Sequence, residues 1–123
     1  METKFNFNSQ VCTSRSQSER LLALGLKKET ADMVWLNHAL TEDYDDWRSE
    51  PIYKDWEGWQ KDGIPAWSLH RLLMMIDSDV QTDGRYISLP NYGFVKKDNI
   101  YDNIIDAIEW LIKEGYFNKE YLV

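Results

Sequence analysis

Hydrophobic residues recur at helical spacing in three stretches of the chain. In the first, Ser16 and Glu19 have the spacing of a capping box, in which each side chain bonds a free backbone N–H at the start of a helix. The helix they predict carries three leucines and ends at Gly25, where a left-handed glycine and Leu26 are typical of a Schellman motif. The leucines are Leu21, Leu22 and Leu24.

The second stretch follows Pro65 and predicts a helix that ends near Asp77. Ser68 can cap it, and Trp67 and Leu72 have the spacing of a hydrophobic staple across its first turn. One apolar stripe consists of Leu69, Leu72, Leu73 and Ile76. Met74 and Met75 flank this stripe, so the helix carries more apolar surface than one buried face needs.

The third stretch predicts the longest helix, from Asp98 or Asn99 to just before Gly115. Its apolar face consists of Ile100, Tyr101, Ile104, Ile105, Ile108, Leu111 and Ile112. Trp110 falls among the polar residues on the opposite side. Either another segment of the chain covers Trp110, or this side chain anchors a second molecule.

The remaining stretches predict strands and loops. Met33–Leu36 is short and apolar, as in a buried strand, whereas 85–89 and 92–96 read as a hairpin around Pro90-Asn91. Residues 1–10 read as a loose lead-in, and 37–64 as an ordered acidic, aromatic loop with a short helix near 55–61. These elements predict one α+β domain over 1–123, with about three main helices packed on a small antiparallel sheet that includes the 85–96 hairpin.

Charge narrows the range of partners. The 123 residues carry a net charge of −7, and the stretch from Glu42 to Asp62 holds eight acids against three bases. The only adjacent pairs of bases are Lys27-Lys28 and Lys96-Lys97, so no cationic footprint for direct nucleic-acid binding is present. No apolar run is long enough for a membrane span, and the start of the chain lacks a signal-peptide pattern. With its single cysteine, Cys12, the chain is expected in the cytoplasm.

No motif for catalysis, a cofactor or a metal emerges from the residues. His38 and His70 have no second His or Cys at ligand spacing, and the glycines form no phosphate-binding loop. Asp79 begins a weak match to a calcium loop, but Pro90 stands where the bidentate Glu should be. Cys12 is expected to be a buried, inert thiol. We therefore predict no catalytic residue, no cofactor and no metal site.

The leading hypothesis is a non-enzymatic interaction protein that binds another protein or itself. Its candidate contact residues are the surplus apolar side chains and the aromatics of the acidic segment, namely Trp110, Met75, Trp47, Tyr53, Trp56 and Trp59. One alternative is a small-ligand binder, with carbohydrate as a candidate ligand, or a hydrolase with its pocket among those aromatics and nearby carboxylates. Another alternative is an acidic decoy that occupies a DNA-binding protein.

Several local patterns resemble those of a group of small uncharacterised proteins encoded by bacteriophages and bacterial mobile elements. They are Val11-Cys12-Thr13, Ser18–Gly25, Thr30–Met33, Ile64–Leu69 with Leu72-Leu73, Ile105–Ala107, Glu109–Ile112 and Gly115-Tyr116. The resemblance covers about two thirds of the chain and omits the acidic segment and the 85–96 hairpin. It implies a bacterial cytosolic setting and a strand at Met33–Leu36, and it carries over no catalytic residue.

Overall fold

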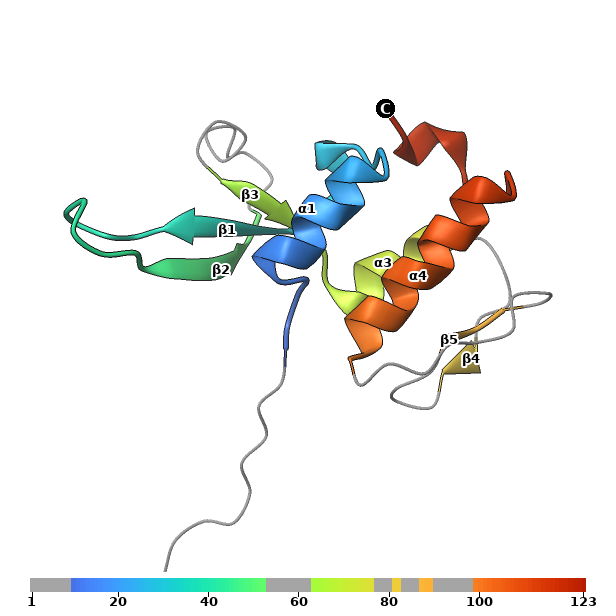
Figure 1. The fold of residues 1–123 in the computed structure, drawn as a ribbon, viewed down its shortest axis with the longest axis horizontal. Coiled ribbons are helices and arrows are strands. Elements are labelled where there is room, and N and C mark those ends of the chain that lie inside the picture. Colours follow the sequence, from blue (N-terminus) through green and yellow to red (C-terminus); the bar gives the residue numbers. More distant parts are fainter. Residues whose placement is uncertain (1–9, 53–62, 77–80, 83–86, 90–98) are drawn as a thin grey trace, which may run out of the picture.

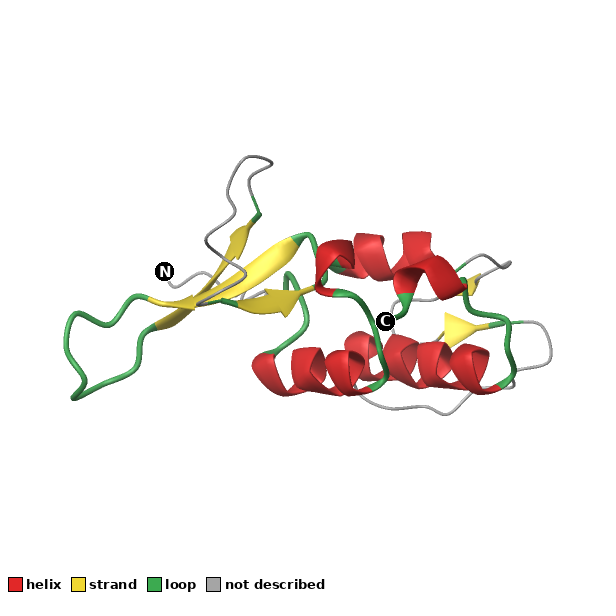
Figure 2. Cartoon of the chain, turned by 90° about the horizontal axis from the view of Figure 1, so that it is seen from above, coloured by secondary structure: helices red, strands yellow, loops and turns green. Residues whose placement is uncertain are grey.

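The computed structural model describes residues 10–52, 63–76, 81–82, 87–89 and 99–123. Along them lie α1 (Arg15–Ala23), η1 (Lys28–Thr30), β1 (Met33–Asn37), β2 (Trp47–Pro51), β3 (Ile64–Ala66), α3 (Leu69–Met75), β4 (Gln81–Thr82), β5 (Ile87–Ser88), α4 (Ile100–Lys113) and η2 (Lys119–Tyr121). Helices and an antiparallel sheet confirm the predicted α+β class. The helices gather at one side of the molecule, and the three-stranded sheet extends from them (Figures 1 and 2).

Helix α1 is capped two residues earlier than the sequence predicted. Ser14 is the N-cap: its hydroxyl accepts the backbone N–H of Gln17, and the Gln17 side chain accepts the N–H of Ser14. The predicted Ser16 box is therefore wrong. The predicted end is confirmed, because Gly25 has φ 104° and the N–H of Leu26 donates to Leu21.

Helices α3 and α4 begin where their caps predicted. Ser68 accepts the backbone N–H of Arg71, and Asn99 accepts those of Tyr101 and Asp102. Helix α3 ends at Met75, two residues before the predicted end. Helix α4 ends in a second left-handed glycine, Gly115, with φ 77°.

The core lies between α1, α3 and α4. It consists of Leu21, Leu26, Ala31, Trp67, Leu72, Met75, Ile76, Leu89, Tyr101, Ile104, Ile105, Ala107, Ile108, Leu111 and Phe117. The apolar stripe of α4 supplies much of this set, as its spacing predicted. Residues after α4 return to α1, where Lys27 donates to Tyr121 and Val123 donates to Gly25 through their backbones.

The main sheet has the order β2-β1-β3 and is antiparallel. Strand β1 confirms the predicted strand, but β2 and β3 lie at or within the 37–64 segment that was predicted as a loop. The predicted 85–96 hairpin is not confirmed as part of the sheet. Residues 87–88 pair instead with 81–82, and residues 90–98 lie outside the described ranges, as do 1–9 and the predicted 55–61 helix.

Each outer strand of the main sheet carries a proline where the sheet needs no donor. On the β2 side, Ile52 donates to Asp32 and Asp46 accepts from His38. Because the bonding direction alternates along a strand, Pro51, which lies opposite Met33, has its nitrogen facing away from β1. Pro65 lies opposite Val34 on the other edge, with the same outward direction. Proline is tolerated at such edge positions because no ladder hydrogen bond is lost.

A polar junction joins the sheet to the helices. Asp32 accepts both the backbone N–H and the hydroxyl of Ser68, at 2.8 and 2.5 Å. The buried Thr13 hydroxyl accepts the N–H of Trp67, and the Trp35 indole donates to the carbonyl of Thr13. These bonds hold the base of the sheet against the start of α3. Among the described residues, no helix is long and apolar enough to cross a membrane.

Candidate protein-interaction surface

The β1–β2 hairpin is the part of the described chain that stands furthest from the helices (Figures 1 and 2). Its strands pair in register from Met33 opposite Pro51 to Asn37 opposite Trp47. Residues 38–46, here called the hairpin loop, connect the two strands. They carry four carboxylates and no Lys or Arg, which gives a local charge of −4 with His neutral.

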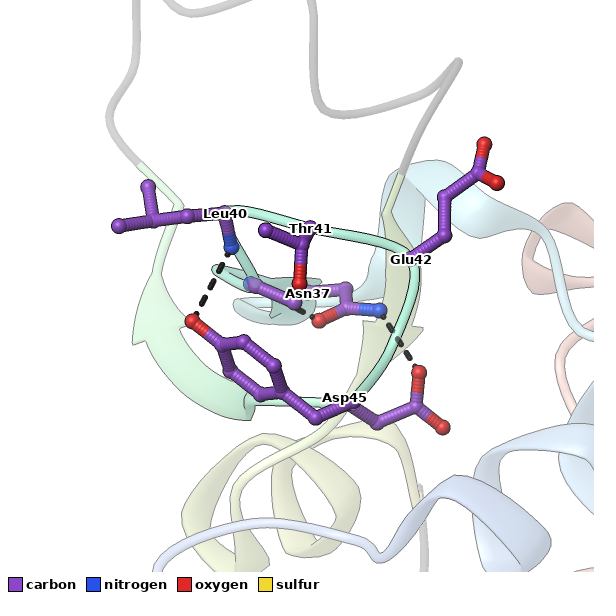
Figure 3. A pocket seen from close by; sticks show the side chains of 7 residues that line it. Asn37, Leu40, Thr41, Glu42 and Asp45 are labelled. Atoms are coloured by element: carbon purple, nitrogen blue, oxygen red, sulfur yellow. Dashed lines mark hydrogen bonds between the residues drawn. The ribbon is translucent and has the colours of Figure 1, made fainter.

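A single asparagine at the end of β1 organises the hairpin loop. The Asn37 side-chain oxygen accepts the backbone N–H groups of Ala39 and Asp46, at 3.1 and 2.9 Å. Its amide nitrogen donates to the Asp45 carboxylate at 3.2 Å. In Figure 3 the Asn37 and Asp45 side chains point toward each other across the loop. Asn37 thus links both ends of the loop.

Further bonds hold the outer part of the hairpin loop. The N–H of Leu40 donates to the Tyr44 hydroxyl at 3.3 Å, and the N–H of Asp43 donates to the Thr41 hydroxyl at 3.4 Å. Together with the Asn37 bonds, they surround a shallow hollow of about 480 Å³. Its walls are Asn37, Ala39, Leu40, Thr41, Glu42, Tyr44 and Asp45.

The hairpin loop exposes its apolar side chains although hydrogen bonds hold its backbone. Leu40 is 90% exposed and Tyr44 is 50% exposed. Figure 3 shows Leu40 and Glu42 both directed away from the loop. The loop therefore presents an uncovered leucine among carboxylates, on a backbone whose shape is fixed by its own hydrogen bonds.

Charged groups at the base of the hairpin are engaged with one another. His38 contacts Glu50 through its Nε2, and Arg48 donates to both oxygens of Asp46 at 3.2 and 2.8 Å. The hydrogen bonds and charge of Asp46 raise the pKa of Arg48. Asp46 is thus partly neutralised, so the carboxylates furthest from Arg48 along the loop dominate its charge.

Trp47, one of the predicted contact residues, begins β2 and is half-buried. The Arg15 guanidinium lies 4.7 Å from the centre of its ring, in a cation–π contact that links α1 to the hairpin. This contact holds the hairpin relative to the helices. Tyr53, Trp56 and Trp59 lie outside the described residues, so their predicted role remains a prediction.

The structure separates the two apolar candidates on the helices. Met75 is only 3% exposed and belongs to the core, so its prediction as a surface contact is wrong, whereas Met74 is 60% exposed. Trp110 is half-buried, packs partly against the core and has its ring 5.9 Å from that of Tyr116. The segment after α4 therefore covers part of Trp110, which was one of its two predicted situations.

The single thiol of the chain is Cys12. Cys12 is buried, and the pKa of its thiol is raised, mainly by desolvation. The hydrogen bond with Ser49 opposes this increase, and the charge of Asp32 adds to it. A protonated thiol is a poor nucleophile and metal ligand. Within the described ranges, no group of three or more His, Cys, Asp or Glu side chains could hold a metal ion.

Sequence reasoning missed Leu40 and Asn37. Leu40 is a lone apolar residue in a polar run, and no spacing rule separates it from a leucine that folds back onto a core. The available signal was the polar 37–46 stretch between two segments able to form strands, which is typical of a hairpin connection.

Comparison of the chain with protein-family models, curated proteins and solved structures gave no significant match.

Proposed function

We propose that this chain is a non-enzymatic protein-interaction module whose hairpin loop binds a basic surface of another protein or of a second copy. One observation carries the proposal: Leu40 is 90% exposed on a loop whose backbone is held in one shape by its own hydrogen bonds. The resemblance to phage and mobile-element proteins extends the proposal to a bacterial cytoplasm.

A lone exposed leucine is ordinary on a protein surface. Leu40 differs because its loop is already ordered in the free chain, so the loop would lose little conformational entropy when a partner binds. An apolar contact surrounded by charge is also the usual anatomy of an interface. The four carboxylates of the loop select a partner whose rim is basic and accelerate its approach.

Capture from a bacterial cytosol tests this function. Immobilised wild-type chain is compared with Leu40→Ser and with Met74→Ser, a matched loss of an exposed apolar side chain on α3. We expect a protein that wild type and Met74→Ser retain and that Leu40→Ser loses, with less capture at high salt because exposed charges are screened. Equal capture by all three variants would contradict the proposal.

The same four carboxylates support a second candidate function, an acidic decoy of a DNA-binding protein. Such a partner would use one basic surface for phosphates and for the hairpin loop. We expect added duplex DNA to displace the captured protein in that case. Capture that is indifferent to DNA leaves the first function and rejects the decoy.

A further inference from the structure

A second hollow lies at the end of α1, and two lysines are among the residues that line it. It has a volume of about 430 Å³ and is lined by Leu22, Leu26, Lys27, Lys28, Glu29 and Val123. Leu22 and the buried Leu26 provide apolar wall, and the exposed lysines border it. Glu29 is the one acidic side chain among the lining residues.

The fold holds this lysine-bordered hollow in shape. Gly25 turns the chain at the end of α1, and the Leu26 N–H donates to Leu21. Across the hollow, Lys27 donates to Tyr121 and Val123 donates to Gly25 through their backbones. The walls therefore come from two segments that are hydrogen-bonded to each other, and a bound side chain would meet a preformed site.

The hollow complements the hairpin loop in both polarity and charge. The loop offers one exposed leucine among acids, and the hollow offers apolar wall beside Lys27 and Lys28, the one adjacent pair of bases in the described ranges. Figure 1 places the tip of the hairpin at one end of the molecule, away from the C-terminus, whose Val123 is one of the residues that line the hollow. The hairpin loop and the hollow of one chain therefore lie apart from each other.

We propose that the occupant of the lysine-bordered hollow is the hairpin loop of a second copy, with Leu40 against Leu22 and Leu26. This inference rests on the proposed function, because it names the partner of the hairpin loop. The contact is heterologous: a pair keeps one unused hollow on one copy and one unused loop on the other, so association continues into rings or chains. One loop in one hollow makes a small interface, so we expect a weak contact that forms only at high protein concentration.

Charge reversal in two matched variants tests the contact. Glu42→Lys with Asp43→Lys replaces two of the four loop carboxylates with lysines and takes the charge of the loop from −4 to 0, and Lys27→Glu with Lys28→Glu reverses the rim of the hollow. Glu114→Lys, an exposed reversal at the end of α4, is the control. Sedimentation velocity is measured for each up to about 1 mM, where about 40% of contacts with a Kd of about 1 mM are formed, and circular dichroism checks that each variant folds.

We expect wild type and Glu114→Lys to gain mass with concentration, and each reversed double variant to remain a monomer. An equimolar mixture of the two double variants restores association, because the new lysines of one loop then meet the new glutamates of the other rim, and the unchanged acidic loop meets the unchanged lysines. Association of wild type that neither reversal weakens would place the contact elsewhere and overturn the inference. A wild type that stays monomeric also overturns it.

The two proposals fail separately. Suppose that wild type is monomeric and captures a protein that Leu40→Ser does not capture. The hairpin loop then binds a different protein, and only the second-copy inference falls. If wild type is monomeric and Leu40→Ser captures as much as wild type, both the inference and the proposed function fall.

Discussion

The α1–α4 helix pair and the β1–β2 hairpin keep their shapes by different means. The helices bury apolar faces, close both ends with capping residues, and are joined by Arg20, which donates to Asp106 and Glu109 at 2.6 and 2.8 Å. The hairpin loop buries little and relies on Asn37 to tie its backbone. The difference separates residues that stabilise the fold from residues that are ordered yet available to a partner.

Truncating one aliphatic side chain in each region gives the largest contrast. Ile104 is fully buried on α4, so Ile104→Ala is expected to lower the free energy of unfolding by about 2–5 kcal/mol. Leu40→Ala should change it by no more than about 0.5 kcal/mol, because that side chain is already in water. Urea unfolding measures both. A comparable loss for Leu40→Ala would mean that the leucine packs within the chain.

The left-handed glycines that end the helices come next. An L-residue in this conformation costs about 1–2 kcal/mol, so Gly25→Ala and Gly115→Ala should each lose about that much stability in urea unfolding. A Cβ at Gly25 would lie 3.9 Å from Leu122, and one at Gly115 would meet nothing within 4 Å. The penalty is therefore in the backbone. Full stability of either variant would show that the turn can reform without glycine.

Removing the side chain that ties the hairpin loop should loosen it without unfolding the helices. Asn37→Ala removes two acceptor bonds and one donor bond at an exposed site, for a loss of about 1 kcal/mol or less. Hydrogen exchange should show faster exchange at the N–H groups of Ala39 and Asp46, with α4 unchanged. Unchanged exchange at both groups would mean that Asn37 does not organise the loop.

The smallest effect concerns pH and the helix pair. The Arg20 hydrogen bond, aided by Lys113, lowers the pKa of Glu109 below its ordinary value of 4.5. The folded chain then binds this proton less readily than the unfolded chain, so the contribution is present above pH 4.5 and is lost as pH falls through the lower folded pKa.

Glu109→Gln should therefore be less stable than wild type at neutral pH, by under about 1 kcal/mol because the pair is partly exposed. The difference should shrink as urea unfolding is repeated at pH values below 4.5. A difference that is constant with pH would assign the effect to packing rather than to charge.

The helices were predictable because their capping and spacing signals are local in the sequence. The wrong N-cap predicted for α1 shows what local signals do not contain. Both Ser14 with Gln17 and Ser16 with Glu19 match the capping-box spacing. Gln17 also donates to Asn99 and Asp102 at the start of α4, whereas Glu19 is exposed. Contacts between helices favour the first box, and no spacing along α1 reveals them.

The sheet was less predictable because its outer strands lack an apolar face. Strand β2 reads Trp-Arg-Ser-Glu-Pro and is half-exposed, so hydrophobic alternation is weak. Proline is depleted in strands, yet Pro51 and Pro65 each stand at an edge position that needs no donor. The candidate surface was only partly predictable, since the acidic character of the segment is visible in the sequence but the exposure of Leu40 depends on the pairing of β1 with β2.

The central claim is that the hairpin loop, and Leu40 in particular, is the binding element of this chain. Photo-cross-linking tests it most directly, with a benzophenone amino acid placed at position 40 and, as control, at position 74 on α3. The account predicts one discrete cross-linked product from position 40, to a second copy or to another protein, and no such product from position 74. Equal products from both positions, or none from position 40, would contradict it.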